Sequence, residues 1–197
     1  MKKLISLITL SLSVSAFAAP KPIVADYKVD TAATKVEWIG KKVTGEHRGM
    51  INVKSGSLNI LQGEIKGGTI VVDMNSMTCT DITDKETNGK FIGHMTSADF
   101  FNTAAHPEAK LVIKKSKKTD KGLEISGDLT MLGKTGPVTF TATDVSATAT
   151  DFTAKSTITI DRTKWDLKYG SGSFFKGLGD KAINDEFSLN VTLSAKK

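Results

Sequence analysis

The sequence has one cysteine and no long apolar run beyond its first twenty residues, and each of these two shortages excludes a class of protein. A single cysteine cannot form an internal disulfide, which excludes a small disulfide-stapled fold. After the N-terminus, no run of about 18 apolar residues could cross a bilayer as a helix. A net charge of +6 without clustered Lys and Arg does not indicate nucleic-acid binding. The 197 residues can instead bury a full apolar core within one domain.

The N-terminus has the three parts of a secretory signal peptide. Lys2 and Lys3 form a basic start, Leu4 to Val14 form an apolar stretch, and Ala16-Phe17-Ala18 is a small-residue cleavage site. We therefore expect residues 1–18 to be a signal peptide that is removed on export. Residues 19–197 then form a single mature domain, located in the periplasm or secreted.

Apolar and polar residues alternate with period two through most of this domain, which is typical of strands with one buried and one exposed face. The clearest run places Phe152, Ala154, Ile158 and Ile160 on one face. Nine candidate strands follow from such runs: Val36/Trp38, Ile51/Val53, Leu58/Ile60, Ile70/Val72/Met74, Leu111/Ile113, Leu123 to Met131, Val138/Phe140/Ala142, Phe152 to Ile160 and Phe187 to Leu193.

Short glycine-bearing connections separate these runs and predict hairpins between consecutive strands. They are Thr44-Gly45, Ser55-Gly56, Gly67-Gly68, Lys121-Gly122 and Gly133-Lys134-Thr135-Gly136. Long antiparallel strands with edges to hide favour closure, so we expect an all-β fold: a single antiparallel β-barrel of about eight strands. Thr83-Asp84-Lys85-Glu86 has the form of a capping box, and one or two short helices are expected between Ile82 and Phe101.

The polar faces of the strands are expected to point into water and the apolar faces into the barrel. Two tyrosines and two tryptophans are too few for the aromatic girdles of an outer-membrane barrel. A barrel of this size can fill its interior with side chains or hold one slender apolar ligand. The sequence leaves both alternatives open.

Catalytic and metal-binding motifs are not evident. His47, His94 and His106 share no spacing typical of a local metal motif, and nothing cationic flanks Cys79, which we expect to be buried and inert. No nucleophile, base and orienting group can be assembled from motif spacing. We predict no catalytic residues, no metal and no enzyme activity; a histidine-dependent enzyme is the remote alternative.

Aromatic residues cluster around the helical segment and around a glycine-rich segment from Tyr169 to Asp180. Phe174 and Phe175 in that segment lie between four glycines, so we expect a mobile lid over one mouth of the barrel. His94 could reach a ligand head group there. The expected apolar lining comprises Trp38, Phe91, Met95, Phe100, Phe101, Leu129, Met131, Phe140, Ile158, Trp165, Phe174, Phe175 and Leu178.

Several ordered motifs resemble the YceI-like family of exported bacterial proteins. They are Tyr27-Lys28-Val29-Asp30, Val36-Glu37-Trp38, Gly45-Glu46-His47-Arg48-Gly49, Gly93-His94-Met95-Thr96-Ser97-Ala98-Asp99-Phe100-Phe101, His106-Pro107-Glu108-Ala109, Gly127-Asp128-Leu129-Thr130-Met131-Leu132-Gly133, Val138-Thr139-Phe140 and Ile160-Asp161-Arg162-Thr163-Lys164-Trp165. The resemblance covers about Tyr27 to Leu193. It implies a lipocalin-like barrel that holds a long isoprenoid or other lipid chain in an apolar pore.

These observations together predict an exported protein that binds a long-chain amphiphile, such as a polyisoprenoid, a quinone or a fatty-acid-like lipid, for periplasmic transport or storage. The alternative is a ligand-free stress-response or interaction module with a filled barrel core. No cofactor is expected other than a bound lipid or isoprenoid quinone. Association as a homodimer stays open.

Overall fold

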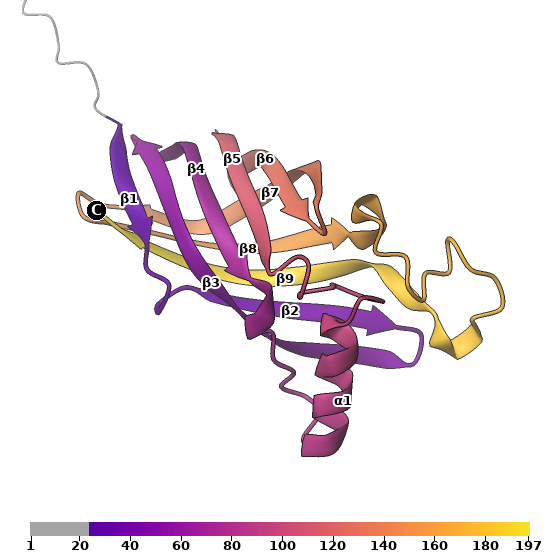
Figure 1. The fold of residues 1–197 in the computed structure, drawn as a ribbon. Helices are drawn as coiled ribbons and strands as arrows, with labels where there is room; N and C mark the ends of the chain where they lie inside the picture. Colours follow the sequence, from indigo (N-terminus) through magenta and orange to yellow (C-terminus); the bar gives the residue numbers. More distant parts are fainter. Residues whose placement is uncertain (1–23) are drawn as a thin grey trace, which may run out of the picture.

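The computed structural model of the protein describes residues 24–197, and antiparallel strands dominate it (Figure 1). The predicted signal peptide lies outside the described residues. One α-helix, α1 (Lys85–Thr96), and three short 3₁₀ turns, η1 (Met74–Ser76), η2 (Arg162–Trp165) and η3 (Gly179–Lys181), interrupt the strands. The strands are β1 (Ala25–Val29), β2 (Lys35–Lys42), β3 (Gly45–Leu61), β4 (Glu64–Asp73), β5 (Glu108–Thr119), β6 (Gly122–Met131), β7 (Lys134–Ala147), β8 (Asp151–Asp161) and β9 (Ile183–Lys196).

The strands close into an eight-position antiparallel barrel. Consecutive strands from β3 to β9 pair as neighbours, β9 pairs with β2, and β2 pairs with β3. The short β1 also pairs with both β3 and β9, so β1 and β2 share one position in the barrel, divided by the turn between Val29 and Lys35. The predicted all-β antiparallel barrel is therefore confirmed.

Two of the predicted turns are wrong because their glycines serve close approach rather than chain reversal. Ser55-Gly56 lies inside β3, where a register shift between Val53 and Ser55 marks an irregularity. A Cβ on Gly56 would lie 2.7 Å from a methyl group of Val29 in β1. Gly67-Gly68 lies inside β4, and the chain turns instead at Gln62-Gly63, both with positive φ. Two predicted strands thus merge into β3, and β1 is an additional one.

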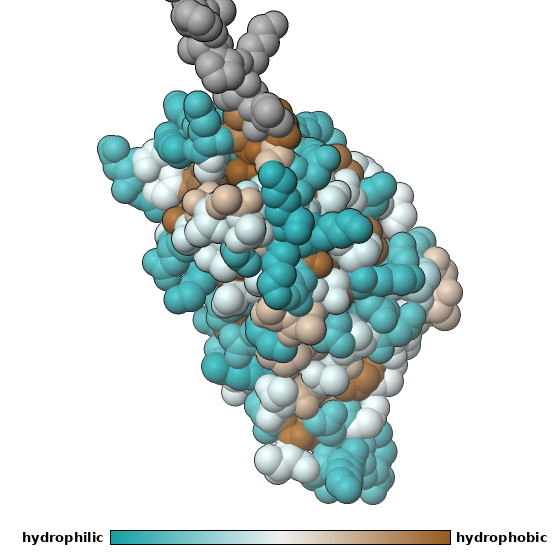
Figure 2. Space-filling view, turned by 90° about the vertical axis from the view of Figure 1, so that its left-hand side faces the viewer, coloured by the Kyte–Doolittle hydropathy of each residue, from teal (hydrophilic) through white to brown (hydrophobic). Residues whose placement is uncertain are grey.

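Period-two alternation places the apolar faces inside the barrel, as predicted. In β8, Phe152, Ala154 and Ile160 are buried, while the alternating residues Thr153, Lys155, Thr157 and Thr159 are exposed. The face of the molecule in Figure 2 is accordingly mostly hydrophilic, with hydrophobic residues only in small separate patches. The polar faces thus point outward, and the apolar faces point toward the barrel axis.

The two ends of the barrel differ. Toward the end with the β3–β4, β5–β6 and β7–β8 turns, a layer of buried side chains crosses the interior: Tyr27, Leu58, Leu123, Phe152 and Ala195 are at most 4% exposed. At the other end, the connection between β4 and β5 contains α1, and a long segment, residues 162–182, connects β8 to β9 (Figure 1). Residues from both insertions border the same chamber at this end.

The predicted helix is present, but its N-cap differs from the prediction. Asp84, not Thr83, caps α1, because its carboxylate accepts a hydrogen bond of 2.9 Å from the backbone N–H of Thr87. Ser97 ends the helix with its N–H donating to the carbonyl of His94. No residue of α1 is fully buried, so the helix rests on the barrel end rather than within the core.

A loop that precedes α1 lies directly on β3. The backbone N–H groups of Thr78 and Thr80 each donate to β3, to the carbonyls of Met50 and Arg48, at 2.9 Å. The close approach requires Gly49, since a Cβ there would lie 1.7 Å from the Thr78 carbonyl oxygen. The same carbonyl accepts a 3.0 Å hydrogen bond from the indole of Trp38.

Replacing Gly49 tests this contact. We expect Gly49→Ala to lower the free energy of unfolding by about 1–3 kcal/mol, because the backbone of the loop must move away from β3. Gly40→Ala in β2 is the matched control, since a Cβ at Gly40 has no atom within 4 Å. Urea denaturation of both variants measures the difference, and equal midpoints would contradict the role given to Gly49.

Candidate functional site

An elongated apolar cavity runs along the barrel axis. It consists of two adjacent chambers of about 130 and 120 Å³ that share six lining residues. The inner chamber is bounded by β-strand side chains such as Ile125, Ile158 and Val191; the outer chamber adds groups from α1 and from the segment after it. The shared lining consists of Val36, Val72, Ala109, Leu129, Ile160 and Leu189.

Polar groups at the inner chamber are already hydrogen-bonded within the protein. The Thr34 hydroxyl donates to the Ser194 carbonyl at 3.2 Å, and the Ser156 hydroxyl donates to the Thr141 carbonyl at 2.8 Å. Burying a polar ligand group there would cost free energy without a compensating hydrogen bond. The inner chamber therefore suits a hydrocarbon chain.

Aromatic and thioether side chains cover the outer chamber. Met95 comes from α1, and the turn after the helix places Phe100 and Phe101 edge to face, with ring centroids 5.2 Å apart. Phe101 also meets Phe187 of β9, with centroids 6.5 Å apart. A flexible methionine beside edge-to-face rings forms a surface that can adapt to an apolar ligand.

The outer chamber is bordered by four polar or charged residues: Lys41, Arg162, Asn184 and Glu186. Arg162 is 2% exposed, and burial lowers the pKa of its guanidinium from the ordinary value. Asp185 carries the nearest opposite charge, 3.8 Å away.

The Arg162 guanidinium fixes the base of the 162–182 segment. It donates to the carbonyl oxygens of Leu167 at 2.7 Å and Tyr169 at 2.9 Å within that segment. It also donates to Asn184 at 3.0 Å and Ile183 at 3.1 Å at the start of β9. Four main-chain carbonyls thus meet one cation, and the guanidinium ties both ends of the segment together.

The structure brings together eight of the predicted lining residues. Phe140 and Ile158 face the inner chamber, Leu129 faces both chambers, and the others face the outer one. The residues that line the cavity are Trp38, Met95, Phe100, Phe101, Leu129, Met131, Phe140 and Ile158.

The other predicted lining residues lie behind or outside the cavity wall. Phe91 stacks behind Trp38, and Trp165 is 2% exposed, with its indole donating to the Leu129 carbonyl at 3.0 Å. Phe174 and Phe175 are each 50% exposed, and they and Leu178 are absent from the lining. Arg162 holds the start of the 162–182 segment in place, and Phe174 and Phe175 of that segment are exposed to solvent.

His94 lies beside the outer chamber without lining it. Its ring packs against Tyr169, with centroids 4.7 Å apart, and against Phe100, with centroids 5.8 Å apart. His94 thus connects the end of α1 to the 162–182 segment. Sequence reasoning did not include Arg162, Met74 and Met77 in the lining. Met74 ends the apolar run Ile70/Val72/Met74, whereas Met77 lies among polar residues and Arg162 gives no apolar signal.

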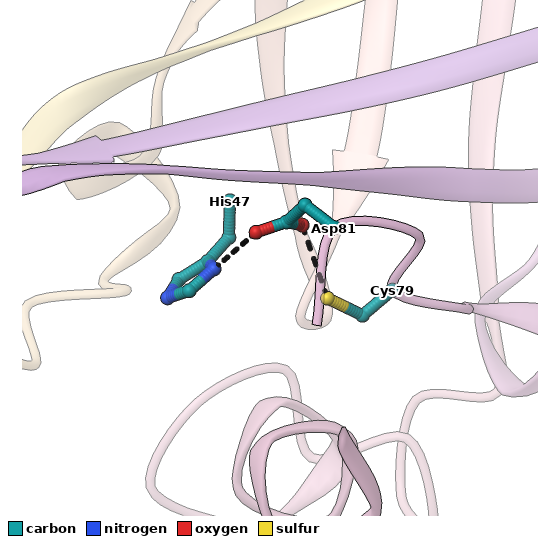
Figure 3. Close-up of side chains that lie close together, drawn as sticks. All are labelled: His47, Cys79 and Asp81. Carbon is teal, nitrogen blue, oxygen red and sulfur yellow. Dashed lines mark hydrogen bonds and ion pairs between the residues drawn. The ribbon is translucent and has the colours of Figure 1, made fainter. Parts of the chain in front are cut away.

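A second group of functional side chains comes together outside the cavity. His47 of β3 meets Cys79 and Asp81 of the loop that lies on β3, as Figure 3 shows. Burial raises the pKa of the Cys79 thiol, as expected for a buried, unreactive cysteine. Partial burial opposes ionisation of Asp81, but hydrogen bonds from the Arg48 N–H, His47 and Cys79 hold its pKa at about 2.

Removing the Arg162 side chain tests its structural role. We expect Arg162→Met to lower the free energy of unfolding by at least about 3 kcal/mol, because it leaves buried carbonyl groups without donors. Lys164→Met, in the same 3₁₀ turn but exposed, is the matched control. Thermal melting and limited proteolysis of both variants measure the effect, and equal stability would refute the anchor.

For the exposed Phe174 and Phe175 we expect almost no loss of stability, in contrast to Arg162. Phe174→Ala combined with Phe175→Ala should change the free energy of unfolding by less than about 0.5 kcal/mol, as is usual for surface substitutions. Two core phenylalanines would each cost roughly 3 to 5 kcal/mol. Thermal melting distinguishes these cases, and a large loss would show that the rings plug the barrel.

Comparison with known proteins identifies the fold. The chain is 33% identical over 153 residues to the protein YceI of Escherichia coli O17:K52:H18, a match that covers 72% of each chain. The crystal structure of BcnA from Burkholderia cenocepacia aligns with a TM-score of 0.65 at 22% identity, covering 84% of this chain and 98% of BcnA.

A polyisoprenoid-binding domain from Saccharophagus degradans aligns with a TM-score of 0.62 at 17% identity, covering 86% of this chain and 97% of that domain. Within residues 24–197, no helix has the length and apolar character needed to span a bilayer. The model of the YceI-like domain matches residues 27–195. The chain therefore belongs to the YceI-like family.

Proposed function

We propose that the protein binds one long-chain amphiphile in the barrel, with its apolar tail along the axis. The observation that carries this proposal is the pair of adjacent apolar chambers inside the barrel. A filled barrel would have no such space, which favours a container over an interaction module with a packed core. The structural similarity to a polyisoprenoid-binding domain supports a ligand of this class.

The distribution of polar groups sets the orientation of the ligand. Buried side chains such as Phe152 and Leu58 lie at the inner end of the cavity, and the Thr34 and Ser156 hydroxyls of the inner chamber are already hydrogen-bonded within the protein. Lys41, Asn184 and Glu186 lie at the opposite rim. The tail therefore enters first, and the head group stays at the rim beside α1.

Chain length supplies most of the affinity in this arrangement. Each buried methylene contributes roughly 0.8 kcal/mol before ordering costs. A ligand with a long tail can therefore bind firmly with few polar contacts. The same reasoning predicts weak discrimination between head groups, so isoprenoid alcohols, quinones and fatty acids of matched length should compete.

The second part of the proposal is that the protein is exported and acts in the periplasm. The basic start, apolar stretch and Ala16-Phe17-Ala18 site predict that residues 1–18 direct the chain out of the cytoplasm. A protein that encloses a lipid tail would then carry or store that lipid in the periplasm. Mass determination of the mature N-terminus tests the cleavage site directly.

Blocking the cavity tests binding. Ala109 is 7% exposed and lines both chambers, so Ala109→Trp should fill the passage between them. We expect at least a tenfold loss of affinity for geranylgeraniol, measured by displacement of a fluorescent long-chain fatty acid. In the parent protein, affinity should rise from geraniol through farnesol to geranylgeraniol.

Lys110→Trp is the matched control, because Lys110 is the next residue of β5 and is exposed. It adds the same indole to the outside of the barrel and should leave affinity unchanged. Melting temperatures of both variants exclude misfolding as the cause. Equal affinity in the folded Ala109→Trp variant, or no dependence on chain length, would refute binding inside the barrel.

A further inference from the structure

Three side chains with metal-binding atoms of different kinds meet between β3 and α1. His47 Nδ1 lies 2.7 Å from one carboxylate oxygen of Asp81, and Cys79 Sγ lies 3.2 Å from the other. No two ligand atoms of the three residues are more than 4.8 Å apart. In Figure 3 the imidazole and the thiol both point toward the Asp81 carboxylate.

We propose that His47, Cys79 and Asp81 form a binding site for a divalent transition-metal ion, with Zn²⁺ as the best match. One thiolate, one imidazole and one carboxylate are a borderline-soft donor set, which suits Zn²⁺ better than Mg²⁺ or Ca²⁺. The site is distinct from the barrel cavity, and the proposal does not depend on lipid binding.

The geometry needs little adjustment. Bond lengths of about 2.0–2.3 Å to a tetrahedral ion place neighbouring ligand atoms roughly 3.5 Å apart. A separation of up to 4.8 Å therefore closes with about 1 Å of side-chain movement. His47 and Asp81 keep 33% and 29% of their side-chain surface exposed, so water can reach the fourth position.

The binding step exchanges a proton for the ion. Zn²⁺ forms bonds with Sγ of Cys79, Nδ1 of His47 and a carboxylate oxygen of Asp81. The S–H bond of Cys79 breaks and its proton passes to solvent. The Nδ1–H bond of His47, which donates to Asp81 in the metal-free site, also breaks and gives its proton to solvent, while Nε2 takes up a proton from solvent, so that His47 binds as the neutral imidazole with its proton on Nε2. The aspartate is already ionised and brings the negative charge that the cation requires.

Neighbouring groups already hold the ligands in place. The Arg48 N–H donates to Asp81 at 2.8 Å, which orients the carboxylate without using its second oxygen. Asn88 of α1 donates to the Cys79 carbonyl at 2.9 Å. The His47 ring packs on Phe91 of α1 with centroids 4.6 Å apart, so a bound ion would also fix the surface on which α1 rests.

Cobalt titration of the tag-free protein under reducing, anaerobic conditions tests the site. We expect one equivalent of Co²⁺ to produce a near-ultraviolet thiolate-to-cobalt charge-transfer band, and Zn²⁺ to abolish it stoichiometrically. Cys79→Ser should lose the band, and His47→Gln should bind Zn²⁺ at least tenfold more weakly. Zn²⁺ should raise the melting temperature of the parent protein but of neither variant.

His106→Gln is the matched control, since it removes a histidine that is not part of the cluster. It should titrate like the parent protein. Circular dichroism without metal establishes that each variant is folded, and His47→Gln keeps the test decisive if Cys79→Ser does not fold. Absence of the band in the parent protein at saturating Co²⁺, or unchanged Zn²⁺ affinity in His47→Gln, would overturn the proposal.

Discussion

Closure of the barrel depends on the long strand β3, which, like β9, pairs with three neighbours. Its 17 residues pair with β2 and then β1 along one edge and with β4 along the other. A strand of this length must bend to follow the barrel, and the register shift beside Ser55 provides the bend. Because closure hides the strand edges, the apolar faces enclose an interior, and the cavity follows from that constraint.

The alternation of residues predicts which face of each strand is buried, but it cannot assign the glycines. Gly56 and Gly68 occur between apolar runs, where a hairpin turn and a close approach of two backbones both require a residue without a side chain. Only the partner strand decides between them, and sequence spacing does not name the partner. The missed β1 has the same cause: five residues are too few for alternation to stand out.

Some residues of the candidate site can likewise be predicted from sequence patterns, and others cannot. Leu129, Phe140 and Ile158 lie on strands, so period two correctly predicts that they face inward. Arg162 escapes such reasoning because its partners are main-chain carbonyls, which carry no sequence signal. His47 and Asp81 are 34 residues apart, and the contact depends on the close approach that Gly49 permits.

The two insertions at the α1 end of the barrel differ in how firmly they are held. Arg162 ties the base of the 162–182 segment to β9 through buried hydrogen bonds, so displacing that segment would expose an unpaired cation and its carbonyls. The α1 helix buries no residue completely, and a helix of 12 residues is marginal without its contacts. Local opening begins where few buried contacts must be broken. The less costly path into the cavity therefore passes beneath α1, past Met95 and Phe100, and the exposed Phe174 lies away from it.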